Sequence, residues 1–193
     1  MKIKLLILLM FAGILRIQAQ NEGNWQQSVK LPQFYLGMQT GLESFTGLFG
    51  VTADFRVSNN FFIHAGAGIG SWGSKISAGI RNEKQYESSF GYGIYISRAS
   101  GLKNFTTSLE TTNGTKNVNM DLLSGLTINP VVSYKWVMKK GNRFFLEAGY
   151  AVPLQSNPWK ILDGSVLTNT STQAMKILSP GGLSAGMGFQ FAL

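Results

Sequence analysis

The sequence predicts an all-β protein, an eight-stranded antiparallel up-and-down transmembrane β-barrel, on the strength of three observations. Apolar side chains recur at every second position along most of the chain, which is the period of a strand and not of a helix. Charged residues make up 13% of the 193 residues, whereas 44% are hydrophobic and 23 are glycine. Finally, a short apolar segment near the N-terminus has the form of an export signal.

The export signal begins with the basic residues Lys2 and Lys4. An apolar stretch from Leu5 to Leu15 follows, and Ala19 offers a small residue for cleavage. This stretch is too short for a stable membrane-spanning helix, so we expect a signal peptide that is removed on export. The chain has no cysteine, which excludes disulfides, zinc fingers and thiol chemistry.

The last segment of the chain shows the alternation most clearly. Leu183, Ala185, Met187, Phe189 and Phe191 share one face, and glycine, serine and glutamine share the other. The same pattern predicts eight strands, at 34–42, 48–57, 61–72, 86–98, 103–112, 117–138, 143–154 and 182–193. An alternative of equal strand number places a strand at 75–82 and leaves 99–116 as a loop.

The connections between these strands are expected to alternate between short and long, as in membrane barrels. Residues 58–60 and 140–142 read as tight turns, whereas 73–85 and 156–179 are long and polar. The second face of each strand carries small and polar residues with few charges, although a water-soluble sandwich should expose Lys and Glu there. The pattern therefore favours an apolar face toward lipid and a polar interior; a secreted lipocalin-like or sandwich fold is the alternative.

Three segments, AGAGIG at 65–70, EAGYAVPL at 147–154 and GLSAGMGFQF at 182–191, complete the pattern. Together with the signal peptide and the eight strands, they resemble the small outer-membrane β-barrels of Gram-negative bacteria, in particular porin-like and outer-membrane-protein-X-like barrels. The resemblance implies a signal peptide at 1–19, a periplasmic N-terminal segment at 20–33 and an outer-membrane barrel at 34–193.

The same resemblance implies a place in the cell and a set of partners. The bacterial outer membrane is the expected location, and its lipids are the expected surroundings. During biogenesis, periplasmic chaperones and the barrel-assembly machinery are the implied partners. That machinery reads the end of the last strand in such families, and Phe189, Phe191 and Leu193 occupy the corresponding positions here.

Turn geometry predicts which polar side chains meet inside the barrel. Faces stay aligned across a tight turn only if the numbers of paired residues sum to an even value. Pairing Val57 with Phe61 places Asp54 opposite His64, and pairing Lys139 with Arg143 places Lys135 opposite Glu147. Because isolated buried ions are costly, we hypothesise a lumenal polar network near the periplasmic end. Its members would be Asp54, Arg56, His64, Lys135 and Glu147, unless some of them extend to the rim instead.

The motifs that suggest chemistry are weak. Residues Gly68 to Gly73 match G-x-G-x-x-G, but they lie inside a period-two segment with no helix after it, which excludes a dinucleotide site. His64 is the single histidine, and a structural pair with Asp54 is favoured over a Ser-His-Asp site for lipid hydrolysis. We therefore expect no catalytic, cofactor or metal site, and no enzyme.

Three functions remain open. The favoured one is a closed barrel whose extracellular loops have a structural, adhesive or binding role; the others are a narrow channel or transport-assisting barrel, and a lipid-modifying enzyme. Basic residues form no run and are not interleaved with aromatics, so a nucleic-acid partner is not expected. Trp159 is a candidate binding anchor, and the Thr/Asn-rich stretch at 163–173 reads as a flexible loop. The expected extracellular loops are 43–47, 73–85, 113–116 and 156–178.

Overall fold

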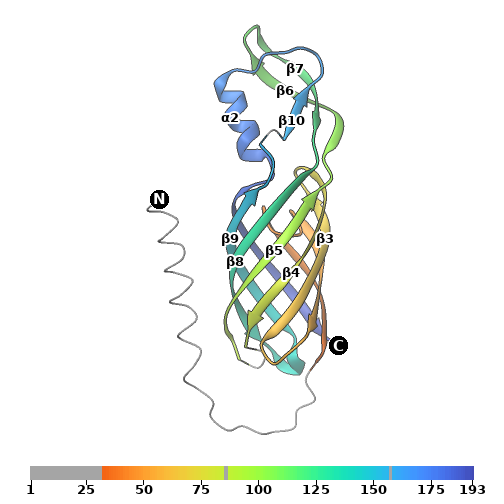
Figure 1. Ribbon diagram of the computed structural model, residues 1–193, viewed down its shortest axis with the longest axis vertical. Coiled ribbons are helices and arrows are strands. Elements are labelled where there is room, and N and C mark those ends of the chain that lie inside the picture. The colour runs from red at the N-terminus through yellow and green to blue at the C-terminus, as the bar shows by residue number, and fades with distance from the viewer. Residues whose placement is uncertain (1–31, 85–86, 157) are drawn as a thin grey trace, which may run out of the picture. The chain divides into compact units, whose positions relative to one another are not determined.

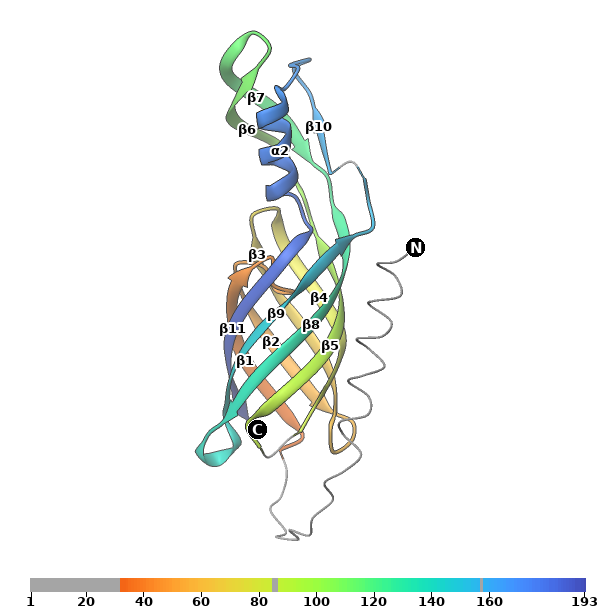
Figure 2. The same cartoon turned by 90° about the vertical axis from the view of Figure 1, so that its left-hand side faces the viewer.

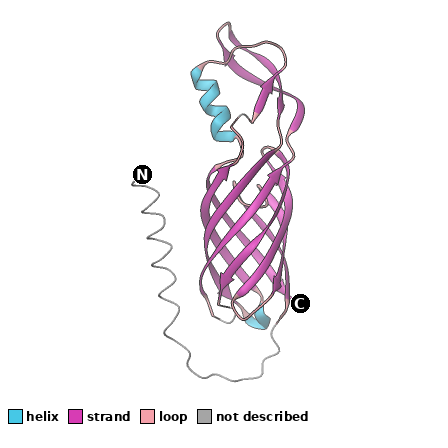
Figure 3. Ribbon diagram, in the orientation of Figure 1, coloured by secondary structure: helices cyan, strands magenta, loops and turns pink. Residues whose placement is uncertain are grey.

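The computed structural model describes residues 32–84, 87–156 and 158–193. The expected signal peptide (1–19) and nearly all of the expected periplasmic segment (20–33) lie outside the described residues. Within them the chain is mostly strand, with one short α-helix and a single-turn 3-10 helix (Figure 3). No helix in this part of the chain is long and apolar enough to cross a membrane.

Eight antiparallel strands close into an up-and-down barrel, which confirms the predicted strand number and barrel architecture (Figure 1). The spatial order is β1-β11-β9-β8-β5-β4-β3-β2. The first and last strands pair with each other, from Tyr35 opposite Ala192 to Leu42 opposite Ala185, so the sheet has no open edge. The barrel strands are β1 (Phe34–Leu42), β2 (Phe49–Arg56), β3 (Phe61–Gly70), β4 (Gly73–Glu83), β5 (Ser89–Ala99), β8 (Gly125–Val137), β9 (Arg143–Pro153) and β11 (Gly182–Ala192).

The remaining elements form a small folded unit at one end of the barrel, here called the cap (Figures 1 and 2). It consists of β6 (Leu102–Thr111), β7 (Gly114–Leu122), β10 (Trp159–Ile161) and α2 (Asn169–Leu178). The three strands form a sheet in the order β10-β7-β6. Residues 100–124 join β5 to β8, and residues 154–181 join β9 to β11, so both inserts leave the barrel at its cap end.

The cap has its own apolar core, and this core includes residues of the barrel mouth. Val118, Met120 and Met175 are buried in it together with Trp72 and Ala99. The Trp72 indole Nε1 also donates a hydrogen bond to the Leu123 carbonyl oxygen at 3.0 Å. These contacts hold the cap on the barrel by packing as well as by the chain connections.

The predicted strand positions differ from the observed ones between residues 73 and 138. Within the expected loop at 73–85, residues Gly73–Glu83 form the barrel strand β4, close to the 75–82 strand of the alternative. The strand expected at 103–112 exists as β6 but belongs to the cap, and 117–138 is divided into β7 and β8. The count of eight barrel strands is still correct. The error arose because the inward-facing positions of β4 carry charged side chains, which resemble a polar loop.

The turn between β8 and β9 is longer than expected. Val137 pairs with Arg143, so the predicted pairing of Lys139 with Arg143 is wrong. Lys139–Gly141 form the 3-10 turn η2, in which Lys140 and Gly141 have positive φ angles of 67° and 81°. The Met138 N–H donates to the Asn142 carbonyl oxygen at 2.7 Å and closes the turn. The register between β8 and β9 is shifted by two residues from the predicted one, so the inward faces of the two strands stay aligned as predicted.

The connections are short at the end where β1 begins and β11 ends, here called the terminal end, and mostly long at the cap end. The exception at the cap end is the β3–β4 connection, a tight turn at Ser71 and Trp72 in place of a long loop. The stretch 163–173 was expected to be flexible throughout, but α2 begins at Asn169. Thr168 caps this helix, because its Oγ1 accepts a hydrogen bond from the Ser171 N–H at 3.3 Å.

Replacing Thr168 by Ala removes this cap and should destabilise α2 by ~1 kcal/mol. We expect the amide protons of α2 to exchange several-fold faster, while those of the barrel strands keep their rates. Hydrogen exchange followed by mass spectrometry measures both. Thr170→Ala is the matched control, because Thr170 is exposed within the first turn and makes no cap. Equal exchange in the two variants would contradict the capping role.

Candidate functional site

The barrel has a polar interior and an apolar exterior. Side chains that point inward along the strands are largely polar or charged and buried, such as Gln39, Thr52, Ser97, Asn129 and Ser184. The outward positions of the barrel strands are mostly apolar: Thr40, Ser74 and Asn82 are polar, and among these positions only Arg98, at the cap end of β5, carries a charge. Exposed apolar side chains on the wall include Leu36, Val51, Ile63, Ile80, Ile94, Val132, Leu146 and Met187. This distribution is the reverse of that in a water-soluble protein.

Aromatic side chains gather on the outside of the wall near the terminal end. Phe90 packs edge-on against Tyr134, which packs against Trp136, and Trp136 lies 5.5 Å from Phe144 between ring centroids. Phe189 and Phe191 form a second pair at 4.9 Å on β11. Rings in such a row, with polar tips on Tyr and Trp, are typical of the boundary between hydrocarbon and headgroups.

Inside the barrel, toward the terminal end, lies a group of charged side chains, here called the lumen ion cluster: Asp54, His64, Arg81, Glu83, Lys135 and Arg143. Asp54 is at its centre and fully buried. One carboxylate oxygen contacts Nδ1 of His64, and the other accepts hydrogen bonds from Nη2 of both Arg81 and Arg143. The Gln190 amide also donates to Asp54, at 2.9 Å.

Glu83 is the second carboxylate of the lumen ion cluster. It lies 3.2 Å from Lys135 Nζ and 3.2 Å from Arg81 Nε, and it accepts a hydrogen bond from Arg143 Nη1. Each arginine therefore joins the two carboxylates. Because the members come from β2, β3, β4, β8 and β9, the cluster links strands on opposite sides of the barrel.

Aromatic rings fill the space around these charges. The Arg143 guanidinium lies 3.6 Å above the Tyr35 ring and 5.0 Å from the Phe62 centroid, and Arg81 lies 5.6 Å from the Phe145 centroid. Phe145 finds room because Gly188 faces it: a Cβ at Gly188 would lie 2.4 Å from the ring. The cluster and its rings together occupy the cross-section of the barrel at this level.

The predicted lumenal network is right in one contact and wrong in another. Asp54 lies opposite His64 in the β2–β3 register and contacts it, as predicted. Lys135, however, lies opposite Phe145, and Glu147 lies opposite Ser133. The cause is the two-residue shift at the β8–β9 turn. Lys135 pairs with Glu83 instead, and Glu147 accepts a hydrogen bond from Gln39.

The guanidinium groups that reach Asp54 belong to Arg81 and Arg143. Arg56, the arginine expected there, is half-buried at the end of β2. Arg81 and Glu83 were not predicted to be lumenal because their segment was predicted to be a loop. A signal was nevertheless present: Ile76, Ala78 and Ile80 alternate with inward-facing Lys75, Ser77 and Arg81.

A second obstruction lies between the lumen ion cluster and the cap end. The β1–β2 connection (43–48) folds into the barrel, and Phe45 on it is only 1% exposed. The Phe45 ring lies 4.4 Å from both the His64 and the Tyr95 ring centroids. Thr46 Oγ1 donates to Gln39 at 3.3 Å. The loop expected to face the exterior therefore fills the lumen instead.

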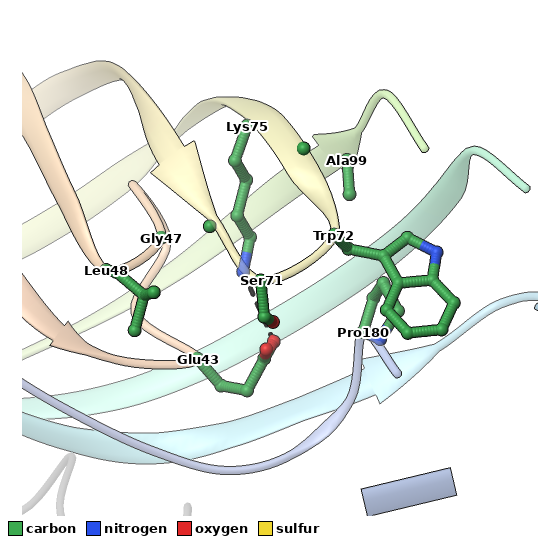
Figure 4. A pocket seen from close by; sticks show the side chains of 10 residues that line it. Glu43, Gly47, Leu48, Ser71, Trp72, Lys75, Ala99 and Pro180 are labelled. Atoms are coloured by element: carbon green, nitrogen blue, oxygen red, sulfur yellow. Dashed lines mark hydrogen bonds and ion pairs between the residues drawn. The ribbon is translucent and has the colours of Figure 1, made fainter. Parts of the chain in front are cut away.

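A small pocket lies at the mouth of the barrel (Figure 4). Glu43, Trp72, Lys75 and Pro180 contribute to its lining, and Lys75 points across it to Glu43, with 3.4 Å between Nζ and Oε2. Its volume is about 20 Å³, which is close to the minimum for one water molecule. A small-molecule ligand therefore does not fit here.

The remaining predicted residues lie at the two ends of the protein. Trp159 is in β10, half-buried, and packs against the apolar core of the cap; its role as a binding anchor stays a prediction. Phe189, Phe191 and Leu193 are at the terminal end of β11, where Phe191 and Leu193 are exposed. Their expected role in assembly stays a prediction.

Comparison with known proteins returns no match among protein-family models, curated proteins or solved structures. In the described ranges, no group of three or more His, Asp, Glu or Cys is placed to bind a metal ion.

Proposed function

We propose that this protein is an integral barrel of the bacterial outer membrane, with a closed lumen and an extracellular cap that carries its structural, adhesive or binding role. The observation that carries the proposal is the apolar outer wall around a charged interior. In water, this arrangement would expose many large apolar side chains to solvent, and soluble monomers rarely expose apolar patches of that size. In a bilayer the same wall meets hydrocarbon, and the closed sheet leaves no strand edge unpaired.

The two obstructions of the lumen favour a closed barrel over a channel. An eight-stranded barrel has an interior just wide enough for side chains. Here the lumen ion cluster crosses it at one level, and Phe45 with its loop fills it at another. A solute would have to displace both, and displacing the cluster would separate buried charges from their partners.

The cap is the part that could act on other molecules. It is folded, with an apolar core, and lies at the end of the barrel opposite to the terminal end, where β11 ends (Figure 2). A folded cap presents a fixed surface, which binds at a lower entropic cost than mobile loops do. His64, the residue considered for lipid hydrolysis, is enclosed between Phe45, Tyr95 and Asp54. Access for a lipid is therefore disfavoured.

The membrane proposal is tested by isolating outer membranes and comparing boiled with unboiled samples by gel electrophoresis. We expect the protein in this fraction, with faster migration before boiling than after it, since a closed barrel resists detergent at room temperature. Recovery of the folded protein in the soluble periplasmic fraction would overturn the proposal.

The closed lumen is tested by reconstituting the purified protein in planar bilayers. We expect no stable conductance steps, because both obstructions contact the strands and are not free to swing out. A matched eight-stranded variant with Phe45→Ala should also stay closed, because the lumen ion cluster is intact below it. Regular steps in the wild type would instead favour the narrow-channel function.

A further inference from the structure

The last turn of α2 exposes an apolar surface beside the barrel. Ile177 is 78% exposed and Leu178 is 54% exposed. The inward side of the helix carries Ser171 and Met175, which are buried against the cap. The helix therefore has one face for the cap core and a separate apolar turn that nothing in the described part of the chain covers.

This apolar turn lies close to the outer wall of the barrel, both in sequence and in space. Ser179 to Gly181 join α2 directly to β11, and the end of the helix lies next to the ends of β9 and β11 (Figures 1 and 2). The first outward residue of β11, Leu183, is 83% exposed, and Leu154, which follows β9, is exposed as well. Exposed apolar side chains of the wall, Leu154 and Leu183, therefore lie at the end of the barrel at which α2 ends.

The length of the strands sets the depth of this turn. Strands of 11 residues, such as β9 and β11, rise ~3.3 Å per residue. With the ~40° tilt of membrane barrels, they span about 25 Å, which is the height of the apolar band of such barrels. Leu183 then lies at the edge of the hydrocarbon, and the segment just beyond it lies among the lipid headgroups.

We propose that Ile177 and Leu178 insert into the lipid surface of the outer leaflet, so that the C-terminal end of α2 contacts the membrane at one side of the barrel. This inference depends on the proposed function, because it requires the barrel to be in a bilayer. Lys176 precedes the two apolar residues and is exposed. A cation beside an apolar pair suits an interface where phosphates lie above acyl chains.

The chain has no cysteine, so single nitroxide labels can be placed without other changes. The test uses Ile177→Cys, with Leu146→Cys on the barrel wall and Asn113→Cys in the exposed β6–β7 turn of the cap as controls. The labelled proteins are reconstituted in vesicles of phosphatidylethanolamine and phosphatidylglycerol. Electron paramagnetic resonance then measures collision with oxygen, which partitions into lipid, and with a nickel chelate, which stays in water.

We expect the ratio of oxygen to nickel accessibility at position 177 to be several-fold higher than at 113 and lower than at 146. A ratio at 177 equal to that at 113, with 146 in lipid, would overturn the inference and leave the membrane proposal standing. Low accessibility to both reagents at 177 would mean that protein covers the turn, and would also overturn it. Nickel accessibility at all three positions would overturn the membrane proposal itself.

Discussion

Replacing Asp54 by Asn should destabilise the barrel by about 3–5 kcal/mol, the cost of breaking a buried ion pair by removing one partner. Asn keeps the size of the side chain, so the loss measures charge and not volume. Arg81 and Arg143 would each lose a carboxylate contact inside the barrel, where water does not replace it. Reversible unfolding in urea from lipid vesicles, followed by tryptophan fluorescence, gives the free energy.

Glu87→Gln is the matched control for this experiment, since it makes the same acid-to-amide change on the surface. The side chain of Glu87 is 70% exposed, and its pair with Lys84 has a distance of 3.4 Å. An exposed pair of this kind contributes ~0–1 kcal/mol, and salt weakens it further. If Asp54→Asn cost no more than the control, the lumen ion cluster would have to be well hydrated instead of sealed.

Replacing Ile94 by Arg should cost about 2–4 kcal/mol, the range for an arginine on the lipid face near the middle of a membrane barrel. Ile94 is the middle residue of β5 and points outward, 46% exposed, between Ile80 on β4 and Pro130 on β8. In a bilayer the guanidinium must extend to the headgroups or draw water into the hydrocarbon. The same unfolding measurement in vesicles gives the cost.

This substitution also discriminates between lipid and water around the wall. Ser108→Arg, at an exposed position of β6 in the cap, is the control and should change stability by less than ~0.5 kcal/mol. An exposed Ile in a water-soluble protein would tolerate arginine about equally well. A negligible cost at Ile94 would therefore argue against lipid at the wall, whatever the fold.

Alternation along the chain was sufficient to predict a barrel of eight strands, but not to identify all eight. The reason is that the hydropathy of a segment averages over both faces of a strand, so charged inward residues hide the apolar outward ones. β11 has small and polar inward residues and was predicted almost to the residue. In β4, Lys75, Arg81 and Glu83 face inward, and the strand looks like a loop until its partners are known.

The lumen was predicted only where a local turn determined the register. The β2–β3 turn placed Asp54 opposite His64 correctly. At the β8–β9 turn, η2 moved the pairing by two residues, which placed Phe145 and not Glu147 opposite Lys135, and Lys135 contacts Glu83 on β4 instead. Contacts between strands that are distant in sequence, such as those of Arg143 with Asp54, depend on closure of the whole barrel. The place of Phe45 depends on the space left by Gly66, where a Cβ would lie 2.6 Å from Thr46 Cγ2.

The pairing of β1 with β11 restricts when this protein can finish folding. β1 is the first of the eight barrel strands to be synthesised, and it cannot form this pairing until β11, the last, has been synthesised. A chain that ends before Gly182 would leave β1 and β9 each with an unpaired edge, and hydrocarbon penalises such edges by several kcal/mol for each backbone group. For the barrel in the bilayer that we propose, insertion strand by strand during synthesis is therefore unfavourable, and the polypeptide has to be held in a soluble state until β11 has been made.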